Sequence, residues 1–187
     1  MGTTGDQGQT HTQRRACESI EGYDPLYPKD YRLFLYGDNS QTIALQRIFT
    51  LHDLNNPNFP YLNVRYVLSL VEINNPDFVK VFEEGETKVY QYNKDLNRVY
   101  LTTSEDVKQP IVSTDEFASI KLYSDNAMII KTVATNERLL VILNRYDSGW
   151  KADIDGINTS LFRAIGLFQA MVVPKGEHIV TLRYQAL

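Results

Sequence analysis

The second half of the chain is a series of short strand-like runs, and this pattern constrains the fold more than any other sequence feature. The runs are FASIKLY, AMIIKTVA, RLLVILNRY, WKADID, INTSLFRA, LFQAMVVP and EHIVTLRY, with turn-forming residues between them. In the last run Val180, Leu182 and Tyr184 share one face of a strand. Short strands at regular spacing are typical of antiparallel sandwiches. We therefore predict a jelly-roll-like antiparallel β-sandwich over residues 115–187.

The first half, residues 17–104, mixes helical and strand patterns, so we predict a mainly β protein with a small α+β region at its N-terminal side. Pro28 suits the first turn of a helix, and Tyr31, Phe34 and Leu35 follow at helical spacing. Gly37 can end this helix. A second helical pattern follows in the chain, and we predict a second helix over residues 43–52.

Strand patterns follow the two predicted helices. We predict strands at 64–70 and 98–102, with a hairpin that turns at Glu84-Gly85 between them. The polar, proline-containing stretch 105–114 predicts a linker between the α+β region and the sandwich. Residues 1–16 are rich in Gly, Thr and Gln, so we expect them to be disordered or vector-derived.

Composition and charge argue against several classes of function. The net charge is -4 and no Lys/Arg cluster stands out, so we expect no nucleic-acid partner. Cys17 is the single cysteine, which rules out an internal disulfide, and the three histidines lie far apart without zinc-ligand spacing. We predict no cofactor and no metal. The sequence has no signal-peptide pattern and its longest apolar run, 164–173, is about half a bilayer span, so we expect this fragment to be soluble.

Asp153 and Asp155 form an Asp-x-Asp-Gly with Gly156, which has two interpretations. On a strand, the two aspartates point to the same face about 7 Å apart, and such a pair can chelate a cation. Alternatively, Trp150 to Asp155 form a strand with one apolar and one polar face, and Asp155-Gly156 forms a type I′ hairpin turn. The turn explains more of the surrounding residues, and we predict the turn.

One group of residues suggests a binding surface. The candidates are Arg145, Tyr146, Trp150, Arg163 and Phe168. Aromatic rings beside arginines form platforms for sugar rings or for charged lipid headgroups. The alternative is that Trp150 and Phe168 belong to the sandwich core and that Arg163 pairs with a surface carboxylate. We predict no catalytic residue in the chain.

Several segments resemble the YfhO family of bacterial multi-spanning membrane proteins. The segments are ESIEGYDPL, LNVRYVLS, VYQYNKDLNRVYL and GWKADIDGINTSLFRAIGLFQAMVVPKGEHIVTLRYQ. The likeness runs from about Cys17 to the C-terminus. Two positions depart from the family pattern, because Ser148 stands where a proline often precedes Gly-Trp, and Gln169 stands where an arginine often follows the aromatic residue.

The resemblance implies an extracytoplasmic domain of a GT-C-like glycosyltransferase at the plasma membrane. Such an enzyme transfers sugar from a polyprenyl-phosphate donor to cell-envelope polymers such as teichoic acids. Its catalytic carboxylate lies in the membrane part, so the resemblance implies an accessory role here, with the transmembrane domain, and an envelope glycan or lipid-linked sugar, as partners. Two alternatives stay open: a carbohydrate-binding module, and a structural or partner-docking domain.

Overall fold

The computed structural model describes residues 22–23, 29–36, 48–49, 54–104 and 106–185, and strands dominate this part of the chain. The first elements are β1 (Gly22–Tyr23), α1 (Lys29–Tyr36), β2 (Ile48–Phe49), the 3₁₀ helix η3 (Phe59–Leu62), β3 (Tyr66–Ser69), β4 (Phe78–Glu84) and β5 (Thr87–Tyr92). The remaining strands are β6 (Val99–Thr102), β7 (Phe117–Tyr123), β8 (Ala127–Ala134), β9 (Arg138–Arg145), β10 (Trp150–Ile154), β11 (Ile157–Thr159), β12 (Phe162–Ala164), β13 (Phe168–Val173) and β14 (Gly176–Tyr184). The predicted mainly β fold is confirmed.

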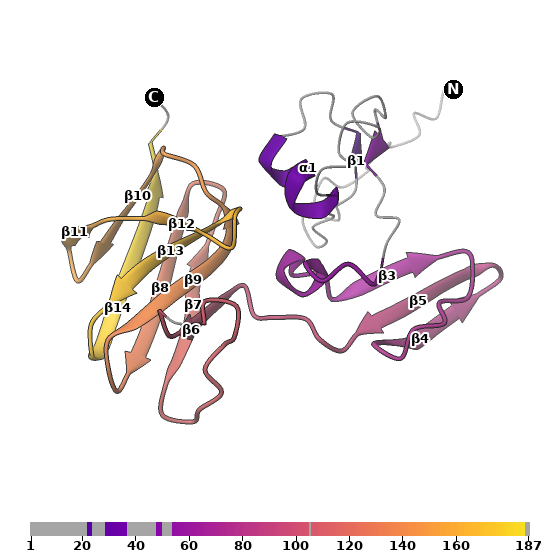
Figure 1. Ribbon diagram of the computed structural model, residues 1–187, viewed down its shortest axis with the longest axis horizontal. Coiled ribbons are helices and arrows are strands. Elements are labelled where there is room, and N and C mark those ends of the chain that lie inside the picture. The colour runs from indigo at the N-terminus through magenta and orange to yellow at the C-terminus, as the bar shows by residue number, and fades with distance from the viewer. Residues whose placement is uncertain (1–21, 24–28, 37–47, 50–53, 105, 186–187) are drawn as a thin grey trace, which may run out of the picture.

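The strands from β6 onward form a sandwich of two antiparallel sheets (Figure 1). One sheet has the order β11-β10-β14-β8-β7, and the other has the order β12-β13-β9-β6. The successive strands β8 and β9 lie in different sheets, and so do β13 and β14. Because β8 pairs with β14 and β9 pairs with β13, the β8–β9 and β13–β14 connections cross between the sheets side by side. This arrangement is jelly-roll-like, as predicted.

The sandwich core lies between the two sheets. Strand β8 alternates strictly between partly buried and buried positions, so Met128 and Ile130 point inward. Leu140 and Ile142 of β9 face them from the other sheet, and all four side chains are at most 1% exposed. The period-2 pattern in the sequence therefore corresponds to real inward and outward faces, since successive strand residues point to opposite sides.

The four-stranded sheet of the sandwich is covered on its outer face as well. Val141, Leu143, Phe168 and Ala170 form part of a second buried cluster there, together with Tyr61 of η3. Side chains from α1 pack against the same cluster. The small N-terminal helix and η3 therefore serve as a third layer over this sheet.

A separate three-stranded sheet, with the order β3-β5-β4, lies at the other end of the molecule (Figure 1). One of its faces forms a third buried cluster with the helices. Tyr90 and Tyr92 of this face pack there on Phe59 and Leu62 of η3 and on Leu35 of α1. The predicted hairpin is confirmed, since β4 and β5 pair through a turn at Gly85, whose φ is 59°.

Two predictions in the first half need separate comment. The first helix is confirmed as α1, but Ile48–Phe49, which we predicted to be helical, forms a strand that pairs with Gly22–Tyr23. Long-range pairing overrides local helical spacing at these two positions. The rest of that predicted helix, at 43–47 and 50–52, lies outside the described residues, as does the predicted N-terminal tail at 1–16.

The predicted linker at 105–114 is attached to the sandwich at several points, where Val107 and Ile111 pack on its buried clusters, while Val112 is 98% exposed. Ile111 N donates to Leu101 O over 2.8 Å. Thr102 Oγ1 lies 2.6 Å from the carbonyl oxygens of both Asp106 and Gln109 and can donate its one proton to either. Strand β6, which precedes this segment, pairs with β9. One strand of the sandwich therefore comes from the chain before the predicted linker, by a long-range pairing that local composition does not encode.

Candidate functional site

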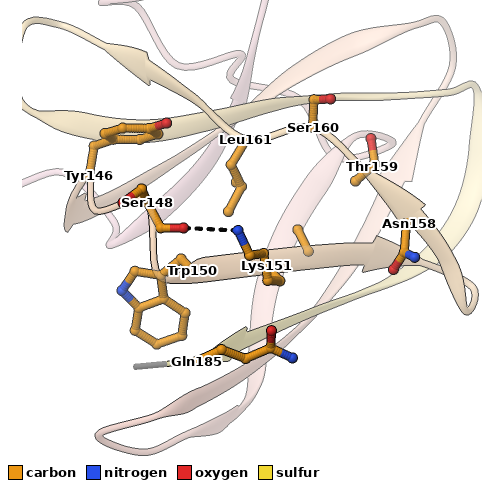
Figure 2. Close-up of a pocket in the computed structure, with 10 residues that line it drawn as sticks. Tyr146, Ser148, Trp150, Lys151, Asn158, Thr159, Ser160, Leu161 and Gln185 are labelled. Atoms are coloured by element: carbon orange, nitrogen blue, oxygen red, sulfur yellow. Dashed lines mark hydrogen bonds between the residues drawn. The ribbon is translucent and has the colours of Figure 1, made fainter. Parts of the chain in front are cut away.

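A groove of about 600 Å³ lies at the edge of the sandwich where the chain passes from one sheet to the other. Figure 2 shows its two walls: the end of the β9–β10 loop with the start of β10, and the segment that leads from β11 towards β12. The lining residues are Tyr146, Ser148, Trp150, Lys151, Ala152, Asn158, Thr159, Ser160, Leu161 and Gln185. The groove is thus built from one hairpin, one crossing segment and the end of β14.

The β9–β10 loop has a defined conformation that positions Trp150. Asp147 Oδ1 accepts a hydrogen bond from Gly149 N over 2.8 Å, and Asp147 O accepts one from Trp150 N over 3.1 Å. Gly149 is required for close packing, because a Cβ there would lie 2.6 Å from Cε2 of Tyr184 and 2.9 Å from Gln185 O. The loop therefore presses directly on the end of β14.

Trp150 is partly buried and borders the groove. Its ring meets that of Tyr184 edge to face, with 5.5 Å between the centroids, and it packs on the edge of the sandwich core. Ala152 and Ile154 follow on the same inward face of β10. The alternation predicted for this strand is confirmed, and the indole is held in place by its neighbours rather than projecting freely.

The groove combines apolar and uncharged polar side chains. Trp150, Tyr146 and Leu161 supply apolar surface, and the rim carries the amides and hydroxyls of Asn158, Thr159, Ser160, Ser148 and Gln185. Of the lining residues that the structure describes, Lys151 alone is charged, and its Nζ donates to Ser148 O over 3.0 Å (Figure 2). An apolar surface edged by hydrogen-bonding groups is the usual character of a small-molecule site.

The two predicted arginines lie beside the groove but face the N-terminal helix. Arg145 Nε donates to Asp30 Oδ1 over 3.2 Å, and Arg163 Nη1 donates to Asp30 Oδ2 over 2.9 Å. Burial raises the pKa of Asp30, but the hydrogen bonds from Arg163 and Arg145 outweigh this and leave the pKa below its ordinary value. Asp30 is therefore the ionised centre of a junction between α1 and the sandwich.

The predicted aromatic residues divide between this junction and the groove. Phe168 is 4% exposed and meets Phe34 of α1 edge to face, with 5.2 Å between the centroids. The Arg163 guanidinium lies 5.3 Å from the centre of the Tyr146 ring. Of the five sequence candidates, Arg145, Arg163 and Phe168 make the junction, Trp150 lines the groove, and Tyr146 belongs to both. The alternative of a buried Phe168 and a carboxylate-paired Arg163 describes the structure better than one exposed platform.

Sequence reasoning missed most of the groove and the central residue of the junction. Asn158, Thr159, Ser160 and Gln185 are ordinary polar residues, and only the return of the chain beside Trp150 brings them to one place. Asp30 lies 115 residues from Arg145 and 133 from Arg163 in the sequence. No local spacing signal connects positions so far apart.

The Asp-x-Asp-Gly forms the predicted hairpin turn between β10 and β11. Asp155 and Gly156 have φ values of 52° and 82°, as the two central positions of a type I′ turn require. Asp153 Oδ2 accepts from Arg183 Nη1 over 3.1 Å, and Asp155 Oδ2 lies 2.7 Å from His178 Nδ1. That hydrogen bond lowers the pKa of Asp155 and raises the pKa of His178. Both carboxylates are therefore engaged with neighbouring strands.

The described residues were also compared with the requirements of a metal site and of a membrane span. No three His, Cys, Asp or Glu side chains in the described ranges lie close enough together to hold a metal ion. No helix among those residues has both the length and the apolar character needed to cross a bilayer. In comparisons with known proteins, the chain matches no family model, no curated protein and no solved structure.

Proposed function

We propose that this chain is a non-catalytic extracytoplasmic domain of a YfhO-type membrane protein. The complete protein is a GT-C-like glycosyltransferase at the plasma membrane, which moves sugar from a polyprenyl-phosphate donor to a cell-envelope polymer such as a teichoic acid. This domain assists the reaction from outside the membrane. We assign no catalytic role to any of its residues.

One observation supports this proposal: the residues that carry the resemblance have structural roles in the fold. Gly149 allows the β9–β10 loop to press on Tyr184, and Asp155-Gly156 turns the β10–β11 hairpin. His178 ties β14 to that turn, and Arg163 fixes the N-terminal helix. These are folding roles, as expected for a domain that shapes or positions something while the chemistry takes place elsewhere.

An uncovered apolar face favours a second role, docking to another protein surface such as the domain's own transmembrane part. Tyr66 and Leu68 of β3 and Val79 and Phe82 of β4 lie on the face of the three-stranded sheet opposite its packed side, and they are 49% to 72% exposed. A contiguous apolar surface of this kind marks an interaction site. Leu68→Glu in the complete protein should then reduce sugar transfer while the isolated domain stays folded.

Cell fractionation tests the main proposal. An antibody raised against this domain should detect a polypeptide much larger than 21.5 kDa in the membrane fraction of the source cells. Protease added to cells stripped of their wall should remove the epitope, because the domain lies outside the membrane. A 21.5 kDa polypeptide in the soluble fraction would overturn the proposal.

A deletion tests the accessory role. Removal of the whole domain, residues 17–187, from the gene, in frame, should leave the protein in the membrane and strongly reduce sugar incorporation into the envelope polymer. Unchanged incorporation would contradict an accessory role in transfer.

A further inference from the structure

We propose that the groove beside Trp150 binds neutral hexose units of a glycan. This inference rests on the proposed function and names the ligand class that the domain holds. Four features of the groove support this ligand class: the rigidity of the aromatic surface, the free hydrogen-bonding groups of the rim, the charge of the lining and the size of the groove.

The aromatic surface is preorganised. The Trp150 ring is fixed by its edge-to-face contact with Tyr184 and by the adjoining core, and Gly149 allows the loop before it to approach Tyr184 closely. A side chain that is already immobilised loses little conformational entropy when a ligand binds. The apolar faces of sugar rings pack well on such aromatic surfaces, and Tyr146 and Leu161 extend the apolar lining.

The rim offers hydrogen-bonding groups that the protein does not itself use. Among the described residues, the side chains of Asn158, Thr159, Ser160 and Gln185 have no hydrogen-bond partner. By contrast, the nearby carboxylate of Asp153 is engaged with Arg183. Amides and hydroxyls both donate and accept, which matches the hydroxyl groups of a sugar. The groove therefore presents free polar groups around an apolar surface, as recognition of a polyol requires.

The charge of the lining selects against ionic ligands. Among the described lining residues there is no carboxylate, the side chain that a divalent cation prefers. Lys151 is the single cation, and one of its donor positions is taken by Ser148 O. A polyanion is normally held by several basic side chains. The lining therefore fits an uncharged ligand, with Lys151 available to donate to a hydroxyl oxygen.

The dimensions agree with this ligand class. The volume of about 600 Å³ falls within the range of roughly 300–1,000 Å³ found for small-molecule sites. The groove lies between β10 and the segment before β12. A short stretch of a neutral oligosaccharide is the ligand expected.

Fluorescence titration tests the proposal at the site itself, because Trp150 is the only tryptophan in the chain. The probes are the neutral oligosaccharides maltotetraose, cellotetraose and chitotetraose, with poly(glycerol phosphate) as the anionic comparison. We expect at least one neutral probe to give a saturable change in emission that is insensitive to salt. The double variant N158A/S160A retains Trp150 and should weaken that binding about tenfold or more, the equivalent of two lost hydrogen bonds.

Two controls separate loss of binding from loss of folding. Tyr66→Ala removes an exposed aromatic residue from the three-stranded sheet and should leave the titration unchanged. Trp150→Phe retains an aromatic ring, and isothermal titration calorimetry should detect binding that is weaker but present. Thermal unfolding of each variant shows that it is folded under the conditions of the titration.

Three results would overturn the proposal: no response to any neutral probe at millimolar concentration, equal binding by wild type and N158A/S160A, or binding of poly(glycerol phosphate) alone with a steep salt dependence. These failures are distinguishable from failure of the proposed function. Fractionation and deletion test where the domain lies and whether transfer needs it, and neither result depends on sugar binding in the groove.

Discussion

The sandwich and the three-stranded sheet bury their surfaces to different extents. The four-stranded sheet of the sandwich has a core on one face and a second cluster, covered by α1 and η3, on the other. The β3-β5-β4 sheet packs on η3 through one face and leaves large apolar side chains exposed on the other. Stability should therefore be concentrated in the sandwich, while the open face of the small sheet contributes little to it.

The two regions also use charge differently. In the sandwich, Glu116 is 5% exposed and accepts hydrogen bonds from Thr135 and from Arg138 Nε, the latter over 3.1 Å. On the small sheet, Lys80 donates to Glu83 and Glu72 over 2.7 and 3.0 Å, in an exposed cluster. Exposed ion pairs contribute little because water screens them and the side chains lose freedom. Position in the fold, rather than bond length, decides what each pair contributes.

The largest expected effect is in the sandwich core. Leu140→Ala, at a fully buried position, should lower the free energy of unfolding by about 2–5 kcal/mol, because it removes buried apolar surface and leaves a cavity. Leu68→Ala is the matched change on the open sheet face, where Leu68 is 72% exposed. It should change the free energy of unfolding by less than about 0.5 kcal/mol. Urea unfolding measures both changes in free energy. Similar losses for the two variants would contradict the inference that stability is concentrated in the sandwich.

The next effect concerns the buried carboxylate. Glu116→Gln should destabilise the chain by roughly 1–3 kcal/mol, because Arg138 loses its charged partner. Although burial opposes it, hydrogen bonding from Thr135 and Arg138 lowers the pKa of Glu116 to about 2. Its contribution is therefore present above the unfolded pKa of about 4.3 and is lost as the pH falls towards 2.

Chemical unfolding at several pH values checks this sign. The difference between wild type and Glu116→Gln should be full at neutral pH and should shrink steadily below about pH 4.5. Glu83→Gln, in the exposed cluster of the small sheet, should give no resolvable change in the free energy of unfolding at any of these pH values. A constant difference for Glu116→Gln would contradict the role of its charge.

A smaller effect is expected at the junction between α1 and the sandwich. Asp30→Asn keeps the size of the side chain but removes the charge that Arg145 and Arg163 share, and should cost about 1 kcal/mol. The loss should appear as faster hydrogen exchange in α1, residues 29–36, with the sandwich core unchanged. Asp147→Asn is the control, because it weakens a 3.8 Å contact with Arg145 and keeps a side-chain oxygen that can accept from Gly149 N.

The smallest effect is the pH dependence of the β10–β11 turn. The hydrogen bond to Asp155 raises the pKa of His178 above its ordinary value. The contribution of protonated His178 is therefore full below about pH 6.5 and is lost as the pH rises through the folded pKa. The melting temperature of wild type should exceed that of His178→Gln by more at about pH 5.5 than at about pH 9. The same difference at both values would mean that His178 acts without its charge.

Local sequence patterns predict the mainly β class, most strands of the sandwich and several turns. The run INTSLFRA, predicted as one strand, is instead divided into β11 and β12, which lie in different sheets. Alternating apolar residues specify which side of a strand is buried, and Asp155-Gly156 specifies a turn that needs positive φ at both positions. These features depend on residues that are neighbours in the chain. The same alternation places Trp150 on the face of β10 shared by Ala152 and Ile154, while its partial burial and its place beside the groove come from the structure.

Which distant segments meet depends on tertiary packing. It placed β6 in the sandwich and Ile48–Phe49 in a strand, and it brought Asp30 between Arg145 and Arg163. It also gathered the polar residues of the groove around Trp150. Local sequence sets the preferences of each segment, but contacts between residues far apart in the chain arise from burial of whole faces against one another. A junction or a groove made by such burial has no period or spacing in the sequence from which it could be predicted.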